Sequence, residues 1–237
     1  MFVHRYECTP APYASLRLFI FTCLQRMPPK FQKSRNYAKL DQQHEDDVLD
    51  AYSWILETTG TQDVVLAHIP SLLDHLAIPH IYTRDITECI EWFYDIAKVK
   101  TARGGPRWII AQDLLTQLTI SSYVNGEFDV SDVVDIDKLL KFCARLIKFR
   151  DCSETIESAW ALFLDAGGSP KTGRLSAKEL RRVKSYLQLD DISDSILIDM
   201  LGCGAADGRV DFSFSGSELS IGIKSFAEIL GQLGELD

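Results

Sequence analysis

The sequence predicts an all-α protein of two lobes, in which pairs of helix–loop–helix units are joined by short strands in their loops. Apolar residues recur at helical spacing along most of the 237 residues. Two copies of a helix–loop–helix pattern occupy the C-terminal third, and two fainter copies precede them. With 46% hydrophobic and 25% charged residues, the composition is that of an ordinary globular protein.

The clearest helix–loop–helix pattern lies in residues 159–187 and is that of an EF-hand. An EF-hand has two amphipathic helices around a 12-residue loop, with Gly at position six and a bidentate Glu at position twelve. With Glu179 at position twelve, Gly173 takes position six and Leu175 takes position eight, the apolar strand position. Positions one, three and five then hold glycine, proline and threonine, where calcium requires oxygen ligands such as carboxylates. The pattern predicts a hand that keeps its shape but binds helices rather than calcium.

A second copy occupies residues 191–233, because hands come in pairs joined through their loop strands. Its loop is expected over residues 206–212, with Val210 in the turn that leads to the loop strand. Residues 213–223 are interpreted as an insertion between this loop and the closing helix. Asp207 is the one side chain at a plausible ligand position before the loop glycine, so calcium binding is not expected here either.

Two fainter hands make up the predicted N-terminal lobe, residues 41–150. The first helix opens at Glu45, within a run of acidic residues that the helix dipole favours. It breaks at Gly60, residues 64–66 form a short extended run, and Pro70 lies in the first turn of the next helix.

The second hand of this lobe is predicted from helices over residues 84–98 and 138–149. Its position twelve is Lys138, a cation where calcium needs a carboxylate. Residues 98–126 are too long for an EF-hand loop and are interpreted as an insertion, in which residues 108–120 form an extra helix or strand. Helical segments that are interrupted near Asp151 are expected to link this lobe to the next.

Residues 1–40 precede the two predicted lobes, 41–150 and 151–237, and differ from them in charge. They contain seven Lys or Arg and one acidic residue. A basic disordered tail, a translation start at Met27 and an acid-poor mitochondrial presequence all fit this composition. The apolar run in this segment is too short for a transmembrane helix.

The formal net charge of −9 argues against direct binding of nucleic acid, because phosphate contacts need concentrated Lys and Arg. The same acidity suits a partner helix that carries basic residues. Six cysteines are scattered without a C-x-x-C pair or a Cys/His cluster, which favours a reducing compartment with the thiols as small apolar residues.

No catalytic arrangement stands out in the sequence. The five histidines all lie in the first third, and no acidic residue completes a metal-ligand set with them. The glycine pairs lack the strand, helix and Lys of a phosphate-binding loop, and the serines lack a G-x-S-x-G motif. The sequence therefore predicts a protein that is not an enzyme and that uses no cofactor and no metal.

The predicted binding site is an apolar groove in the C-terminal lobe, where splayed helices of paired hands take one amphipathic partner helix. Without calcium to switch it, this groove is expected to stay in one state. The residues predicted to line it are Trp160, Phe163, Leu180, Val183, Leu187, Met200, Leu201, Phe226, Ile229 and Leu230. The alternative, that these side chains are only core, is expected to hold for about half of them.

Four degenerate hands in this order resemble the calmodulin–centrin superfamily and, more closely, the fungal centrin-like DNA repair family Rad33. The resemblance runs from about residue 45 to the end, interrupted by the two insertions. The segments that carry it are residues 45–49, 68–70, 134–140, 158–162, 205–208 and 231–234.

This resemblance implies a calcium-independent adaptor in nucleotide excision repair, which binds an amphipathic helix near the C-terminus of an XPC-like DNA-damage-recognition protein. It implies a nuclear location, with the cytoplasm also open, and no direct contact with nucleic acid or membranes. The alternative is a centrin-like or light-chain-like structural subunit on a cytoskeletal or spindle-pole target. The same groove serves both functions, so the residues alone do not choose between them.

Overall fold

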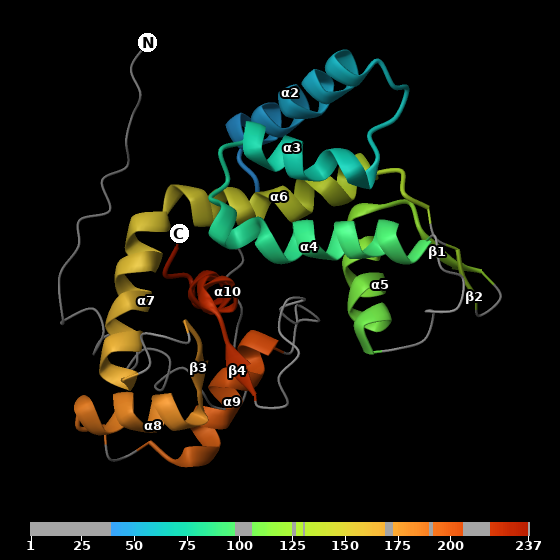
Figure 1. The fold of residues 1–237 in the computed structure, drawn as a ribbon. Coiled ribbons are helices and arrows are strands. Elements are labelled where there is room, and N and C mark those ends of the chain that lie inside the picture. The colour runs from blue at the N-terminus through green and yellow to red at the C-terminus, as the bar shows by residue number, and fades with distance from the viewer. Residues whose placement is uncertain are drawn as a thin grey trace, which may run out of the picture.

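The computed structural model describes residues 39–97, 106–124, 127–129, 131–168, 173–189, 192–205 and 219–236. These residues are mostly helical (Figure 1), which confirms the all-α prediction. The elements are α2 (Gln42–Thr59), the 3-10 helix η1 (Leu66–His68), α3 (Ile69–His75), α4 (His80–Ala97), α5 (Pro106–Leu118), β1 (Ser122–Val124), β2 (Glu127–Asp129), α6 (Ile136–Asp151), α7 (Ser153–Gly167), β3 (Leu175–Ser176), α8 (Ala177–Tyr186), α9 (Asp194–Ala205), β4 (Ser220–Ile221) and α10 (Ile223–Leu233).

Helix α2 forms where the sequence predicted the first helix. The Asp41 side chain caps its start by accepting a hydrogen bond from the backbone N–H of His44 at 2.8 Å. Gly60 ends it in the left-handed conformation, with a φ of 65° that glycine adopts without strain. Val65 then pairs with Val133 in an isolated antiparallel bridge, and α3 begins with the predicted proline in its first turn.

The second pair of helices in the N-terminal half is α4 and α6, each longer at its start than predicted. Helix α5 packs against both of them, so the stretch predicted as an extra helix or strand is a helix. Its Trp108 ring lies 6.3 Å from the ring of Trp92 on α4. The predicted insertion therefore contributes to the hydrophobic core.

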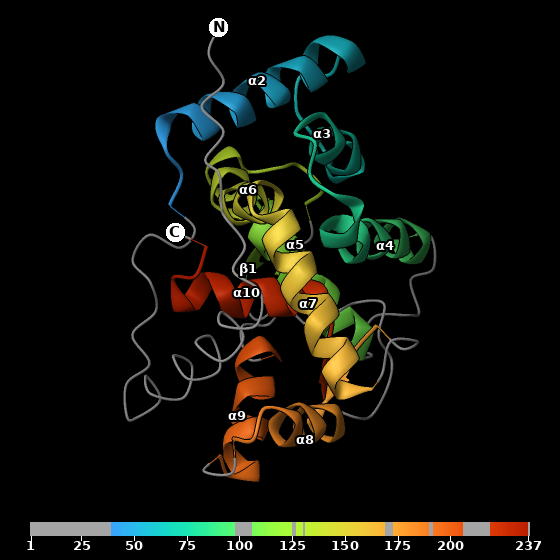
Figure 2. The ribbon, with the colours of Figure 1, turned by 90° about the vertical axis from the view of Figure 1, so that its left-hand side faces the viewer.

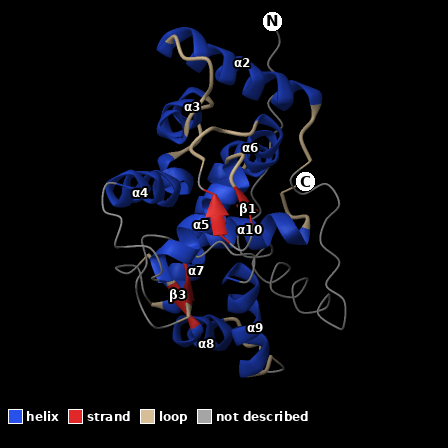
Figure 3. Cartoon of the chain, turned by 90° about the vertical axis from the view of Figure 1, so that its right-hand side faces the viewer, coloured by secondary structure: helices blue, strands red, loops and turns tan. Residues whose placement is uncertain are grey.

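The antiparallel pair of strands β1 and β2 was not predicted from the sequence; both are labelled in Figure 1, and β1 again in Figure 3. Tyr123 pairs with Phe128, and a bridge between Thr119 and Val134 continues the pairing toward the start of α6. A signal was available: the register leaves residues 125–126 between the strands, and they read Asn-Gly, the commonest two-residue hairpin turn. Those two residues lie outside the described part of the chain.

The C-terminal half contains the predicted helix, loop, strand and helix of the third hand as α7, β3 and α8. Gly173, at the predicted position six, has a φ of 59°, a conformation that favours glycine. Leu175, at the predicted strand position, pairs antiparallel with Ile221 of β4. Two helix–strand–helix units therefore meet through their strands, as predicted for a pair.

The predicted register of the fourth hand was wrong. Val210, in the loop predicted to supply the strand, lies outside the described residues, whereas the residue paired with Leu175 is Ile221. Ile221 was predicted to lie in an insertion, residues 213–223. The apolar pair Ile221 and Ile223, both buried, fixes the strand and the start of α10 instead.

Helix α10 joins the two halves of the molecule (Figures 1 and 2). It packs against α7 and α9 in its own half and against α4 and α6 in the other. Helix α6 ends at Asp151 and α7 begins at Ser153, at the predicted interruption. Buried apolar side chains from α2 to the end of α10 form one continuous cluster. Within the described residues, no helix combines the length and hydropathy needed to cross a membrane.

Candidate partner-binding site

The described residues of the predicted groove lie among α7, α8, α9 and α10, which contact one another in that order. Phe226 is central: its ring centroid lies 5.2 Å from that of Trp160 and 5.2 Å from that of Phe163. These geometries are typical of favourable aromatic contacts. The exposed fractions are 6% for Trp160, 2% for Phe163 and 3% for Phe226, so the three rings fill the centre of the lobe.

The remaining predicted groove residues lie around this aromatic cluster. The side chain of Met200 lies outside the described residues, and that of Ile229 is half-buried. The buried members are Leu180, Val183, Leu187, Leu201 and Leu230. The structure therefore brings the described residues of the predicted set together as the packed interior of these four helices.

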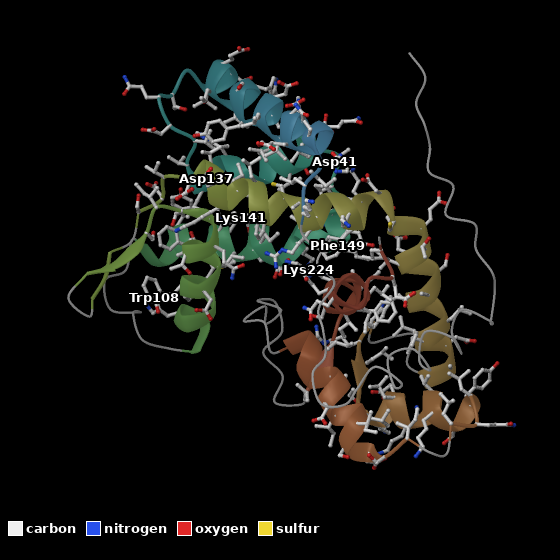
Figure 4. All side chains as sticks on the ribbon, turned by 180° about the vertical axis from the view of Figure 1, so that it is seen from behind. Asp41, Trp108, Asp137, Lys141, Phe149 and Lys224 are labelled. Atoms are coloured by element: carbon white, nitrogen blue, oxygen red, sulfur yellow. The ribbon has the colours of Figure 1, made fainter. Side chains whose placement is uncertain are left out.

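Two ion pairs hold α10 against the N-terminal half. The Lys224 ammonium lies 2.7 Å from a carboxylate oxygen of Asp85 on α4, and Figure 4 shows Lys224 where these helices meet. Arg145 on α6 lies 3.8 Å from the Glu228 carboxylate, and both side chains are nearly buried. Because these side chains are largely shielded from water, separating either pair would leave a charge without its partner. These pairs oppose movement of α10 away from α4 and α6.

Glu179, at the position twelve predicted for the third hand, caps helix α8. The Glu179 carboxylate accepts hydrogen bonds from the backbone N–H and from the hydroxyl of Ser176, which forms a capping box at the start of α8. The Arg182 guanidinium donates to the carbonyl oxygen of Gly167 at 3.1 Å, next to the predicted first loop position. A side-chain cation thus binds a carbonyl beside this loop.

Lys138, at the position twelve predicted for the second hand, holds a backbone carbonyl instead. The Lys138 ammonium donates a hydrogen bond of 2.6 Å to the carbonyl oxygen of Thr119. Asp135 caps α6 by accepting from the backbone N–H groups of Asp137 and Lys138. Within the described ranges, no group of three or more His, Cys, Asp or Glu side chains is placed to hold a metal ion.

The two buried cysteines, Cys89 and Cys143, are expected to be poor nucleophiles. Burial raises the pKa of the Cys143 thiol from 9.0 to about 12. Burial also raises the pKa of Cys89 to about 12, with a further contribution from the nearby Asp85 carboxylate. A thiol that stays protonated is a poor nucleophile, so these two residues serve as packing.

Two exposed apolar side chains on α2 were not predicted as surface residues. Leu49 is 38% exposed, whereas Val48, Ala51 and Ile55 form the buried stripe of the same helix. Trp54 is 39% exposed on the same helix. Its position, six residues after the buried Val48, lies outside the buried stripe, which is the signal that could have found it.

Comparison with known proteins finds one family. A family model described as Rad33 matches residues 34–192, about two thirds of the chain. The matched segment runs from just before α2 to just after α8. Neither a curated protein nor a solved structure matches the chain.

Proposed function

The chain belongs to the Rad33 family, and on that premise we propose that it is a calcium-independent adaptor that binds a helix of a DNA-damage-recognition protein. Family membership indicates a role in DNA repair, in nucleotide excision repair. The proposed partner helix is amphipathic and lies near the C-terminus of an XPC-like protein, and the complex acts in the nucleus. The protein has no catalytic role in this proposal.

The proposed architecture is a two-lobed, centrin-like arrangement of degenerate EF-hands. Two pairings support it, since Val65 bridges Val133 in one half and Leu175 pairs with Ile221 in the other. Each pairing joins the two loops of one lobe. The extra elements α5, β1 and β2 then elaborate the second hand without removing its pairing.

One observation carries the proposal of calcium independence. In each lobe a side-chain cation binds a backbone carbonyl in or beside the loop, Lys138 at Thr119 and Arg182 at Gly167. Because each of these carbonyl oxygens already accepts a hydrogen bond from a side-chain cation, we expect neither loop to change when calcium is added. In this proposal the conformation of the adaptor depends on its partner and not on calcium.

The proposed binding site is the interior of the C-terminal lobe. Because the aromatic cluster of Trp160, Phe163 and Phe226 is buried, the partner helix must exchange contacts within the lobe for contacts with itself. Helix-in-groove complexes place their large apolar anchors in such positions. The ion pair between Asp85 and Lys224 opposes this opening and so limits which partners bind.

Copurification tests the choice of partner. The full chain, expressed at native level with a tag, is recovered from nuclear extract at moderate salt, and bound proteins are identified by mass spectrometry. Recovery of an XPC-like protein, lost in the Trp160→Ala variant and retained in Trp108→Ala, supports the proposal. Recovery of myosin-like or spindle-pole proteins instead would support the alternative of a structural subunit on a cytoskeletal target.

A further inference from the structure

The outer face of α2 exposes two apolar side chains far from the aromatic cluster. Helix α2 is an outermost helix of the N-terminal half (Figures 1 and 2). Leu49 is 38% exposed and Trp54 is 39% exposed on this helix. The Trp54 ring stacks on His75 of α3, with ring centroids 4.4 Å apart and an interplanar angle of 22°. This contact fixes the indole at the surface, where it presents an apolar face.

The strip of α2 between these two side chains is acidic. Asp46, Asp50 and Glu57 are exposed and share one side of the helix, because their spacing repeats near 3.6 residues. Residues 40–83, which include α2 and α3, contain eight Asp or Glu and no Lys or Arg. This segment therefore carries a formal charge of −8, compared with −9 for the whole chain.

The chain itself carries a segment of opposite charge next to this face. Residues 27–39, which end where α2 is about to begin, contain four Lys or Arg and no Asp or Glu, together with Phe31 and Tyr37. Leu40 packs against the core and fixes the point where this segment joins the helix. Trp54 lies about 18 Å along α2 from the first residue of this helix, Gln42, at 1.5 Å per residue. About six extended residues span that distance.

We propose that residues 27–39 dock along the outer face of α2, with the basic side chains on Asp46, Asp50 and Glu57 and the aromatic side chains against Leu49 and Trp54. Because residues 27–39 are covalently joined to the start of α2, their effective concentration at this face is high, so weak contacts are enough for binding. The docked segment covers the exposed apolar pair. This inference concerns a different surface from the aromatic cluster, so it stands or falls independently of the proposed adaptor function.

Zero-length cross-linking of the full chain tests this docking. A carbodiimide joins a Lys amine to a carboxylate that touches it, and the links are located by mass spectrometry. Lys30 and Lys33 are expected to link to Asp46, Asp50 or Glu57 at least about fivefold more often than to the exposed Glu154 and Glu157 of α7. The preference is expected to fall in half-molar salt, because salt screens exposed charges.

Two controls make the result decisive. An equal mixture of isotopically light and heavy chains shows whether each link is within one chain, and links mainly between chains would overturn the proposal in favour of a second copy as occupant. In the variant Asp50→Asn with Glu57→Gln, links to Asp46 are expected to drop at least about threefold. The matched variant Glu154→Gln with Glu157→Gln should leave them unchanged. Links spread evenly over α2 and α7, or none to α2, would also overturn it.

Discussion

The Lys138 ammonium and the Thr119 carbonyl oxygen are 2.6 Å apart, so a lysine at the start of α6 binds the backbone at the end of α5. This hydrogen bond connects α5 to α6. In the proposed EF-hand arrangement, Lys138 takes the position where a calcium-binding hand carries its bidentate glutamate. The proposal therefore predicts that Lys138 stabilises this part of the fold without calcium.

We expect the Lys138→Met variant to lose about 1.5–3 kcal/mol of unfolding free energy, the range for hydrogen bonds to charged groups. The methionine keeps most of the apolar stem but leaves the Thr119 carbonyl without its charged donor. Urea unfolding followed by circular dichroism measures the change. Lys141→Met on the exposed side of the same helix is the matched control and should shift stability by less than about 0.5 kcal/mol. Equal midpoints for the two variants would show that the bond contributes little.

Stability is expected to fall above pH 9 through the buried thiols. The pKa of Cys143 is 9.0 in its ordinary state and about 12 in the fold, so between these values the unfolded chain has lost a proton that the folded chain keeps. The unfolded state then binds fewer protons, and unfolding free energy falls with rising pH, by about 1.4 kcal/mol per pH unit for each thiol. The contribution is fully present below pH 9 and is lost as pH rises toward 12.

Urea unfolding at pH 8 and at pH 10.5 measures this slope. The Cys143→Ala variant should start less stable but lose less between the two pH values than the unmodified chain. The exposed-surface variant Lys141→Met should keep the full slope. An identical loss in Cys143→Ala would mean that other groups cause the pH dependence.

Millimolar calcium is expected to leave helix content and the thermal midpoint unchanged. In the two predicted loops, the Glu179 carboxylate is engaged in the cap of α8 and Lys138 brings a positive charge, so neither position twelve is free to bind calcium in the proposed arrangement. Circular dichroism with calcium and with chelator compares the two conditions, and magnesium serves as the control ion. A calorimetric titration with a stoichiometric site of about micromolar affinity, as in sensor hands, would refute this.

Deleting residues 1–26 should leave the folded body intact. Among the described residues, the helices begin with α2 at Gln42, and the buried cluster contains residues from Leu40 onward. The thermal midpoint of the shortened chain is expected to stay within about 2 °C of the full chain, the shift that corresponds to less than about 1 kcal/mol. Insolubility, or a clearly lower midpoint, would show that the segment belongs to the fold.

Local rules were sufficient for those parts of the fold that local residues determine. Gly60 and Gly173 adopt the left-handed conformations that their patterns required, and Leu175 lies in a strand as its loop position predicted. The EF-hand pattern gave the wrong register in the fourth predicted loop. Gly208 in Ala-Asp-Gly matches the glycine position of such a loop, but the strand residue is Ile221. Without the pairing partner, the sequence offers no means of choosing between these two registers.

The candidate site could be predicted only in part. The helical spacing of Trp160 and Phe163 identifies side chains that face inward, but their burial depends on how closely four helices pack. The ion pair between Asp85 and Lys224 joins residues 139 positions apart, and no local pattern predicts it. The burial of Trp160 and Phe163 therefore depends on tertiary packing, which the local sequence does not predict.

The proposed site in the C-terminal lobe is tested most directly by a matched pair of tryptophan variants. Trp160 and Trp108 have similar exposed fractions, 6% and 8%, but only Trp160 lies in the aromatic cluster. Both Trp→Ala variants are expected to lose about 3–5 kcal/mol of stability, so the comparison is made at a temperature where both are folded.

The decisive measurement is the calorimetric affinity of each variant for the C-terminal helix of the proposed XPC-like partner, with the urea midpoint measured in parallel. We expect at least a tenfold weaker affinity for Trp160→Ala, about 1.4 kcal/mol or more, and a change of less than about threefold for Trp108→Ala. Unchanged affinity in Trp160→Ala despite lower stability would refute the proposed site, because Trp160 would then be a core residue and the lobe interior would not bind the partner.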